Sequence, residues 1–239
     1  MATRSPSRWF LIVPGLLGVA FLLLVPPISQ DQAYHSFADQ RTILGIPNFW
    51  NVVSNAGFLV VGIMGLLRFK DVASRILFAG VLLTSVGSSY YHWAPGDSRL
   101  VWDRLPMTLV FMSLLSIVLG IWFDAHLGRL LLPPALVFGV ASVFWWWSTG
   151  DLRPYAVAQF GPLLILIPAL IFCKPARGLW PVLLFYAAAK FAEEYDQSIY
   201  TWAVLSGHTF KHVLAALATL WIFLWRRDSS SIIGSDANS

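Results

Sequence analysis

Charged residues are scarce in this chain of 239 residues, where Asp, Glu, Lys and Arg together make up only 12%. Soluble domains carry about 25%. Hydrophobic residues reach 57%, and the mean hydropathy is +0.68. A water-soluble globule of this size could not hide so much apolar surface, because much of any folded surface faces water. The composition therefore excludes a soluble enzyme and indicates a membrane protein.

Cysteine is almost absent, since Cys173 is the single example. Intramolecular disulfides and cysteine metal cages are therefore excluded. The charge imbalance is also small, because sixteen basic and twelve acidic residues give a net charge of +4. In a membrane protein, a small excess of basic residues is better interpreted from their positions in the loops, which indicate orientation, than as affinity for nucleic acid. We expect no nucleic-acid partner.

Long apolar runs are abundant instead. A helix needs about 20 mostly apolar residues to cross the hydrocarbon core, and eight such stretches occur: 9–28, 49–67, 74–93, 100–123, 128–147, 155–173, 179–198 and 204–226. They predict an all-α polytopic membrane protein. Its predicted parts are an N-terminal transmembrane segment (1–30), an extracytoplasmic loop (31–48), a seven-helix core (49–227) and a disordered cytoplasmic tail (228–239). The first segment could instead be a signal peptide.

The basic residues predict an orientation. With a cytoplasmic N-terminus, ten Lys and Arg residues fall on the inner side and four on the outer side. This distribution fits the positive-inside rule, and an even number of spans places the C-terminus inside as well. Short loops and missing targeting signals favour a bacterial inner membrane.

Ionisable residues inside the predicted spans gather at their outer ends. They are His92, Asp103, Glu193, Glu194, Asp196, His208 and His212. Such groups are costly in lipid and mark functional sites by default. Because the orientation rests on Lys and Arg alone, the common depth of these residues is an independent observation. It predicts one polar site at the outer face.

Three histidines in this group suit a metal. His208 and His212 are four residues apart, so a helix projects both imidazoles from one face. His92 lies at the same depth and completes a three-imidazole set, which suits Zn²⁺ with one position left for water. Ser88 shares the helix face of His92. The alternatives are hydrogen-bonded structural histidines, or a closed zinc site with Asp103 as fourth ligand.

These residues resemble the alkaline ceramidase family, within the CREST superfamily of seven-helix membrane hydrolases and receptors. The resemblance rests on the segments FWNVVSN, SSYYH, WDRLPM and GHTFKH, in that order, with Asp103 eleven residues after His92. It implies an amidase that cleaves ceramide-like N-acyl lipids with a zinc-activated water. The implied residues are His92, His208 and His212 as zinc ligands, with Ser88 and Asp103 beside the water.

The sequence also departs from that family. Its members bind calcium through an acid-rich segment before FWN, but here the segment offers only Asp39, with Asn48 as a helper, which argues against a calcium site. Lys211 between the two histidines and the extra N-terminal span are further departures. Two alternatives therefore stay open: a hydrolase of another acyl lipid, amide or ester, and a receptor-like seven-helix protein with structural zinc.

Two other polar segments yield candidate residues. In DLRPY, Arg153 and Tyr155 could contact a lipid headgroup or the reacting carbonyl. The alternative, which the segment favours, is a loop ion pair with an interfacial tyrosine anchor.

In KFAEEYDQ, the i,i+4 spacing predicts that Lys190 pairs with Glu194. Glu193 and Asp196 could then orient a ligand histidine through its other ring nitrogen. The alternative is a polar network that fixes helix packing.

Overall fold

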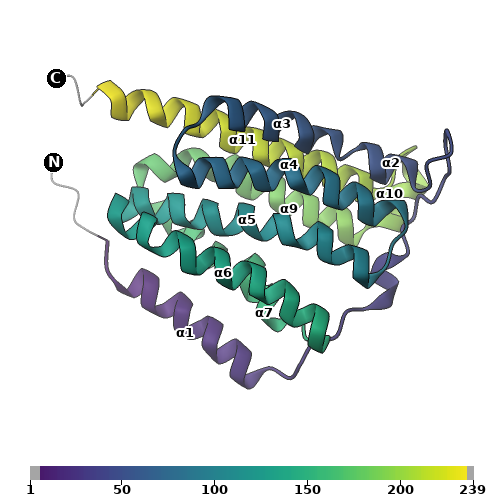
Figure 1. Ribbon diagram of the computed structural model, residues 1–239, viewed down its shortest axis with the longest axis horizontal. Helices are drawn as coiled ribbons and strands as arrows, with labels where there is room; N and C mark the ends of the chain where they lie inside the picture. The colour runs from purple at the N-terminus through teal and green to yellow at the C-terminus, as the bar shows by residue number, and fades with distance from the viewer. Residues whose placement is uncertain (1–5, 236–239) are drawn as a thin grey trace.

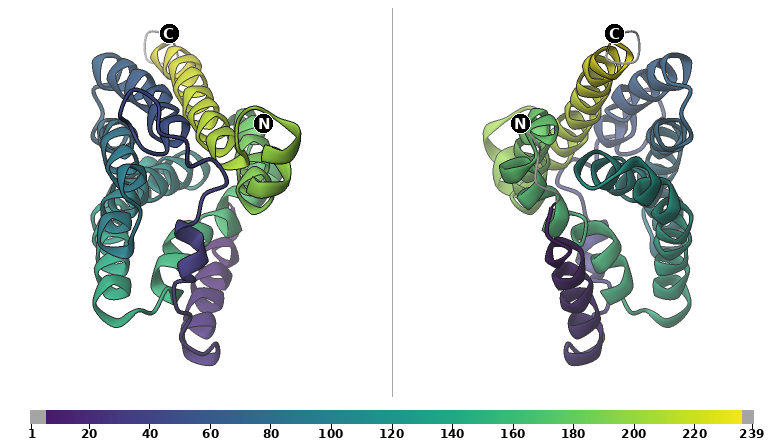
Figure 2. Two further views of the ribbon diagram at one scale, coloured as in Figure 1. Left: turned by 90° about the vertical axis from the view of Figure 1, so that its right-hand side faces the viewer. Right: turned by 90° about the vertical axis from the view of Figure 1, so that its left-hand side faces the viewer.

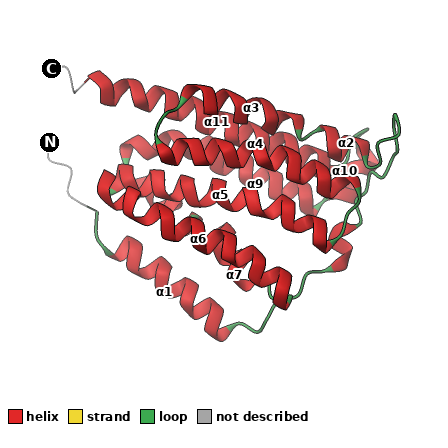
Figure 3. Ribbon diagram, viewed as in Figure 1, coloured by secondary structure: helices red, strands yellow, loops and turns green. Residues whose placement is uncertain are grey.

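The protein is a bundle of helices (Figures 1 and 3), seen in a computed structural model that describes residues 6–235. Most connections are short, and the longest, residues 25–48, joins α1 to α2. The α-helices are α1 (Trp9–Leu24), α2 (Phe49–Val53), α3 (Ala56–Arg68), α4 (Val72–Trp93), α5 (Asp97–Trp122), α6 (Ala125–Thr149), α7 (Arg153–Phe160), α8 (Leu163–Phe172), α9 (Trp180–Glu194), α10 (Asp196–Trp202) and α11 (Gly207–Ser235). Two 3₁₀ helices, Gln32–His35 and Lys174–Leu179, lie in the connections. The all-α prediction is confirmed.

Six helical segments of the described chain are long and apolar enough to cross a membrane: Phe49–Arg68, Val72–Trp93, Asp97–Trp122, Ala125–Thr149, Arg153–Phe172 and Gly207–Asp228. They make this an integral, multi-pass membrane protein in contact with lipid. The other two predicted spans form shorter helices, α1 with 16 residues and α9 with 15. At 1.5 Å per residue, each covers only about 22–24 Å of a hydrocarbon core about 30 Å thick.

The two shorter helices end early for local reasons. Proline lacks a backbone N–H and cannot continue the intrahelical hydrogen bonds, and Pro26 and Pro27 follow closely on the end of α1. The predicted span 179–198 divides at Tyr195 into α9 and α10, and a 3₁₀ helix occupies the residues before Trp180.

Helix α11 extends beyond its predicted end. The sequence predicted a disordered tail over 228–239, but α11 continues to Ser235. Once a long helix is nucleated, each added residue gains one more hydrogen bond at little cost. The prediction is corrected for 228–235, and residues 236–239 lie outside the described residues.

The long helices run alternately in opposite directions, so the start of α1 and the end of α11 lie at the same end of the bundle (Figure 1). Neighbours along the chain pack together from α3 to α6, and α11 packs against α3 and α9 (Figure 2). This places the end of α4, the start of α5 and the start of α11 together at the other end. We call it the histidine end.

Gly87 lets α4 and α5 approach closely at the histidine end. A Cβ atom at this position would lie 2.0 Å from the carbonyl oxygen of Trp102, so a larger residue would push the helices apart. Ser88 follows Gly87, and Asp103 follows Trp102. The glycine therefore brings two of the predicted site residues together from different helices.

The first helix is tied to the core. Phe10 packs its ring 4.8 Å from that of Trp122 and 5.6 Å from that of Phe172. At the other end of α1, Arg153 donates to the carbonyl oxygens of Leu22 and Val25. Whether the N-terminal segment is retained or cleaved stays a prediction.

Candidate metal centre

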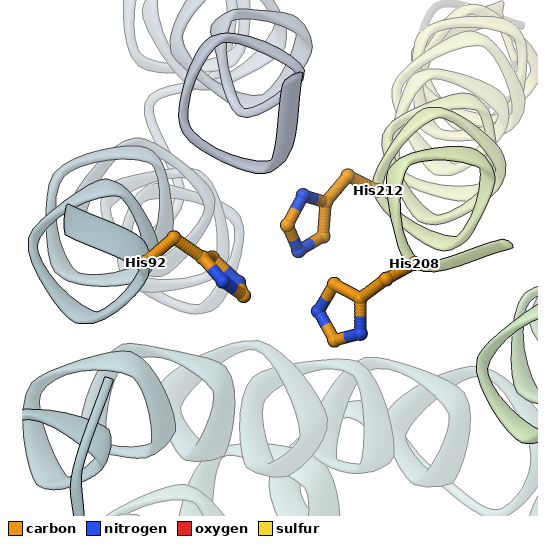
Figure 4. A group of neighbouring side chains, drawn as sticks. All are labelled: His92, His208 and His212. Carbon is orange, nitrogen blue, oxygen red and sulfur yellow. The ribbon is translucent and has the colours of Figure 1, made fainter. Parts of the chain in front are cut away.

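Three histidine rings converge at the histidine end (Figure 4). His92 comes from the last turn of α4, and His208 and His212 come from the first turns of α11. One ring nitrogen from each lies within 4.8 Å of the others, and all three residues are buried. The spatial prediction from the sequence is confirmed: these residues form a group that could hold a metal ion.

The hydrogen bonding of the rings fits a metal. Both ring nitrogens of His92 and Nε2 of His208 are buried without a hydrogen-bond partner among the described residues. Buried polar atoms are nearly always satisfied in folded proteins, because leaving them unpaired costs free energy. A cation between the rings would satisfy one nitrogen of each.

Ser54 contacts one ring nitrogen of His212 and favours one tautomer of the ring. The Ser54 hydroxyl lies 3.3 Å from the carbonyl oxygen of Asn51, which takes its single proton, and 2.8 Å from Nδ1 of His212. With that proton donated to Asn51, the hydroxyl oxygen is placed to accept from Nδ1 in the tautomer that is protonated there. Nε2 of His212 is then unprotonated and able to bind a cation. The sequence motif contained Ser54 but gave it no role.

Asp196 and Asn48 hold the backbone that carries the histidines. The backbone N–H of His208 donates to Oδ1 of Asp196 at 2.7 Å, and Oδ2 accepts from the N–H of Ala38 at 2.9 Å. Asn48 donates from Nδ2 to the carbonyl oxygen of His92 at 2.9 Å. The sequence proposed that Asp196 contacts a histidine ring. It contacts the backbone instead, because Asp196 is the first residue of α10 and packs against the first residue of α11.

Ser88 and Asp103 lie together and are buried, with 2% and 6% of their surface exposed. Both residues line the same pocket, with the Ser88 hydroxyl near the carboxylate of Asp103. Among the described residues, the metal-binding group consists of the three histidines and does not include Asp103. Asp103 is therefore not one of the candidate metal ligands.

An apolar pocket of about 150 Å³ adjoins these residues. Ser88, Asp103, Lys211 and His212 contribute its polar lining at the histidine end. The rest of the lining is mostly apolar, with Thr84, Gln159 and Thr219 as further polar residues. Along α11 the lining extends from Lys211 to Ile222, about 16 Å at 1.5 Å per residue. The pocket is a candidate site for an acyl chain.

Phe37 covers the histidines from the loop side. Its ring centroid lies 4.6 Å from that of His92 and 4.5 Å from that of His208, and only 4% of the residue is exposed. The loop that carries Phe37 is held by the contact between Ala38 and Asp196. The sequence showed no signal for this contact, because it joins residues far apart in the chain.

Glu193 joins two lysines instead of orienting a histidine. Its Oε2 pairs with Lys190, and its Oε1 accepts from Lys211 and from the hydroxyl of Tyr34, the latter at 3.0 Å. The predicted partner of Lys190, Glu194, is exposed. Burial and the Glu193 carboxylate raise the pKa of Tyr34, so its hydroxyl stays protonated and donates.

Tyr155 and Arg153 each have a different partner, and neither lies in the pocket beside the histidines. Tyr155 is buried against Arg104, whose guanidinium carbon lies 4.7 Å from the Tyr155 ring centroid. Arg153 pairs with Asp151 at 2.8 Å, the ion pair that the sequence left open as an alternative. Arg153 lowers the pKa of Asp151 to about 2. Neither residue lines the pocket beside the histidines.

The two residues of the doubtful calcium segment have other partners. Arg41 donates to both carboxylate oxygens of Asp39, at 2.8 Å from Nε and 2.6 Å from Nη2. These hydrogen bonds lower the pKa of Asp39. Asn48 is engaged by the carbonyl of His92. Both residues thus act in holding the loop against the bundle.

The fold and this site define an integral membrane protein with a three-histidine candidate metal centre. Comparisons with protein-family models and with curated proteins find no match to the chain. The function is therefore argued from the site itself.

Proposed function

We propose that this protein is a zinc-dependent membrane hydrolase that cleaves the amide bond of ceramide-like N-acyl lipids. The observation that carries the proposal is the junction of two features: three buried imidazoles with unpartnered nitrogens, and an apolar pocket whose polar end holds Ser88, Asp103 and His212. A lipid carbonyl at the mouth of this pocket would lie beside the histidines.

The donor set favours zinc. Three neutral imidazoles are typical of catalytic Zn²⁺ sites, which keep a further position open for water, whereas structural sites are closed by four protein ligands. The group of three histidines among the described residues supports the open form. When bound, zinc supplies Lewis-acid activation of water and of a carbonyl at neutral pH.

The protein's own residues supply the proton transfers. The Asp103 carboxylate orients the attacking water, accepts its proton and delivers it to the leaving amine. Ser88 lies beside Asp103 in the pocket lining, and its hydroxyl can donate to the oxygen that gains negative charge during attack. The pocket walls bind the acyl chain and exclude bulk water.

The substrate is expected to enter from the lipid. Phe37 covers the histidines on the loop side, while the pocket runs between helices that contact the bilayer. With the orientation predicted from the basic residues, the histidine end faces the extracytoplasmic side, and the substrate comes from the outer leaflet.

The test is release of fatty acid from a defined lipid panel by the purified full-length protein. The panel contains ceramides, N-acyl ethanolamines, N-acyl amino acids and ester lipids, each assayed before and after chelation and after return of Zn²⁺. We expect release from amides that stops on chelation and resumes with zinc. Activity on esters alone would move the assignment to an esterase, and no release by zinc-loaded protein would favour the receptor-like alternative.

Metal content and activity are compared in two variants. His208→Ala should lose bound zinc and turnover, because it removes one of three ligands. His126→Ala is the matched control, since His126 is exposed near the start of α6, at the opposite end of the bundle. The proposal fails if both variants bind zinc and act alike.

A further inference from the structure

A second, larger cavity lies at the end of the bundle opposite the histidines. Its volume is about 1260 Å³, and it is bounded by the start of α4, the end of α5, the start of α6, the 3₁₀ helix Lys174–Leu179 and α11 from Trp221 to Asp228. Val72 lies in its lining and His92 near the other end of the same helix. Twenty residues of helix separate these two positions by about 30 Å.

The cavity carries a surplus of positive charge. Its ionisable lining residues are four cations and two anions: Arg129, Lys174, Arg226, Arg227, Asp71 and Asp228. The ion pairs there are Arg226 with Asp71 at 3.2 Å and Arg227 with Asp228 at 3.0 Å. Within residues 6–235, no ion pair is found for Arg129 or Lys174, and both side chains are exposed. The net charge of the lining is +2.

The remaining walls are apolar, and the helices that form them pack closely together. Ile117, Ile121, Leu132 and Leu224 contribute aliphatic side chains. Gly128 lets α5 and α6 meet at the base, since a Cβ there would lie 2.7 Å from the carbonyl oxygen of Ser116.

Two tryptophans complete the wall on the α11 side. Trp221 donates from Nε1 to the carbonyl oxygen of Gly178 at 2.8 Å, and Trp225 donates to that of Pro175 at 2.9 Å. Their indole N–H groups are thereby satisfied, and their rings lie beside the 3₁₀ helix. The cavity thus joins apolar walls to a cationic rim at the end of the membrane-spanning helices.

We propose that this cavity binds one anionic phospholipid, with its phosphate at Arg129 and Lys174 and its acyl chains along the apolar walls. Basic pockets between transmembrane helices are suited to anionic headgroups, because clustered Lys and Arg side chains at the membrane surface attract the negative phosphate. A small free anion would use the cations but leave the apolar walls exposed. A neutral lipid would fill the walls and leave the surplus charge uncompensated.

The proposal is tested by lipid retention. The full-length protein is reconstituted in nanodiscs of phosphatidylcholine with phosphatidylglycerol, extracted in mild detergent, and analysed by native mass spectrometry for bound lipid. We expect one phosphatidylglycerol to be retained in preference to phosphatidylcholine. The double variant Arg129→Gln/Lys174→Gln should lose this preference, by about fivefold for each cation removed.

The matched control is Arg68→Gln/Lys70→Gln. These residues lie at the same end of the bundle, are exposed, and do not line the cavity, so the net charge changes equally. Equal loss in both variants would overturn the proposal, because it would show attraction to the general surface charge. Displacement of the lipid by inorganic phosphate at millimolar concentration would also overturn it, because the acyl chains would then contribute nothing.

Discussion

The hydroxyl of Ser54 lies 2.8 Å from Nδ1 of His212, which leaves Nε2 as the nitrogen of that ring without this contact. Partners of this kind raise ligand basicity and hold ring orientation, and their removal costs about 10–100-fold in metal affinity. We expect Ser54→Ala to weaken zinc binding by that factor while the protein still folds. Competition with a fluorescent zinc chelator measures it, with Ser148→Ala, an exposed serine on α6, as control. Equal affinities in both variants would contradict the assigned tautomer.

Replacement of Asp103 separates metal binding from turnover. Asp103 is not part of the histidine group, so Asp103→Asn should retain zinc. It should lose about 10²–10⁴-fold in kcat, because an amide cannot accept the proton of the attacking water. Zinc content by mass spectrometry and fatty-acid release on the same sample test this. Loss of zinc in Asp103→Asn would instead identify Asp103 as a ligand.

Removal of Glu193 leaves buried positive charge without compensation. Glu193 pairs with Lys190 and Lys211, and the Lys211 side chain is only 16% exposed. Breaking a buried pair by removing one partner costs about 3–5 kcal/mol. We expect Glu193→Gln to lower the free energy of unfolding by an amount of this order, and Lys211→Met added to it to recover part of the loss. Unfolding in mixed detergent micelles measures both, and Glu194→Gln, which replaces an exposed carboxylate, should be neutral.

The Asp151–Arg153 pair makes the stability depend on pH at the acid end. The pKa of Asp151 is about 2 in the fold, below its usual value of about 3.9. The ionised carboxylate therefore stabilises the protein above about pH 4, and this contribution disappears as the pH falls through about 2. The difference in Tm between the native chain and Asp151→Asn should be largest at neutral pH and should vanish near pH 2. A difference that is constant with pH would contradict the assignment.

The histidine cluster could be predicted from sequence because its signals lie along the chain. The i,i+4 spacing of His208 and His212 and their common depth with His92 need only a helix and a membrane. The partners around the cluster depend on how helices rotate against each other. Lys190 thus pairs with Glu193 and not with Glu194, a difference of one residue that changes the helix face by 100°.

The loop contacts were beyond prediction for another reason. Phe37 reaches His92 and His208 across long separations in the chain, and no local pattern fixes where a loop packs. Helix ends were also misplaced, at α9 and at the tail after residue 227, because apolar runs locate spans but not the turns and breaks that bound them.

Phe37 has a consequence for metal exchange. With its ring over the histidines, a bound ion would be shielded from water-soluble reagents and would be reached mainly from the hydrocarbon side. Phenanthroline, which partitions into lipid, should therefore strip the ion much faster than EDTA, and Phe37→Ala should bring the two rates together.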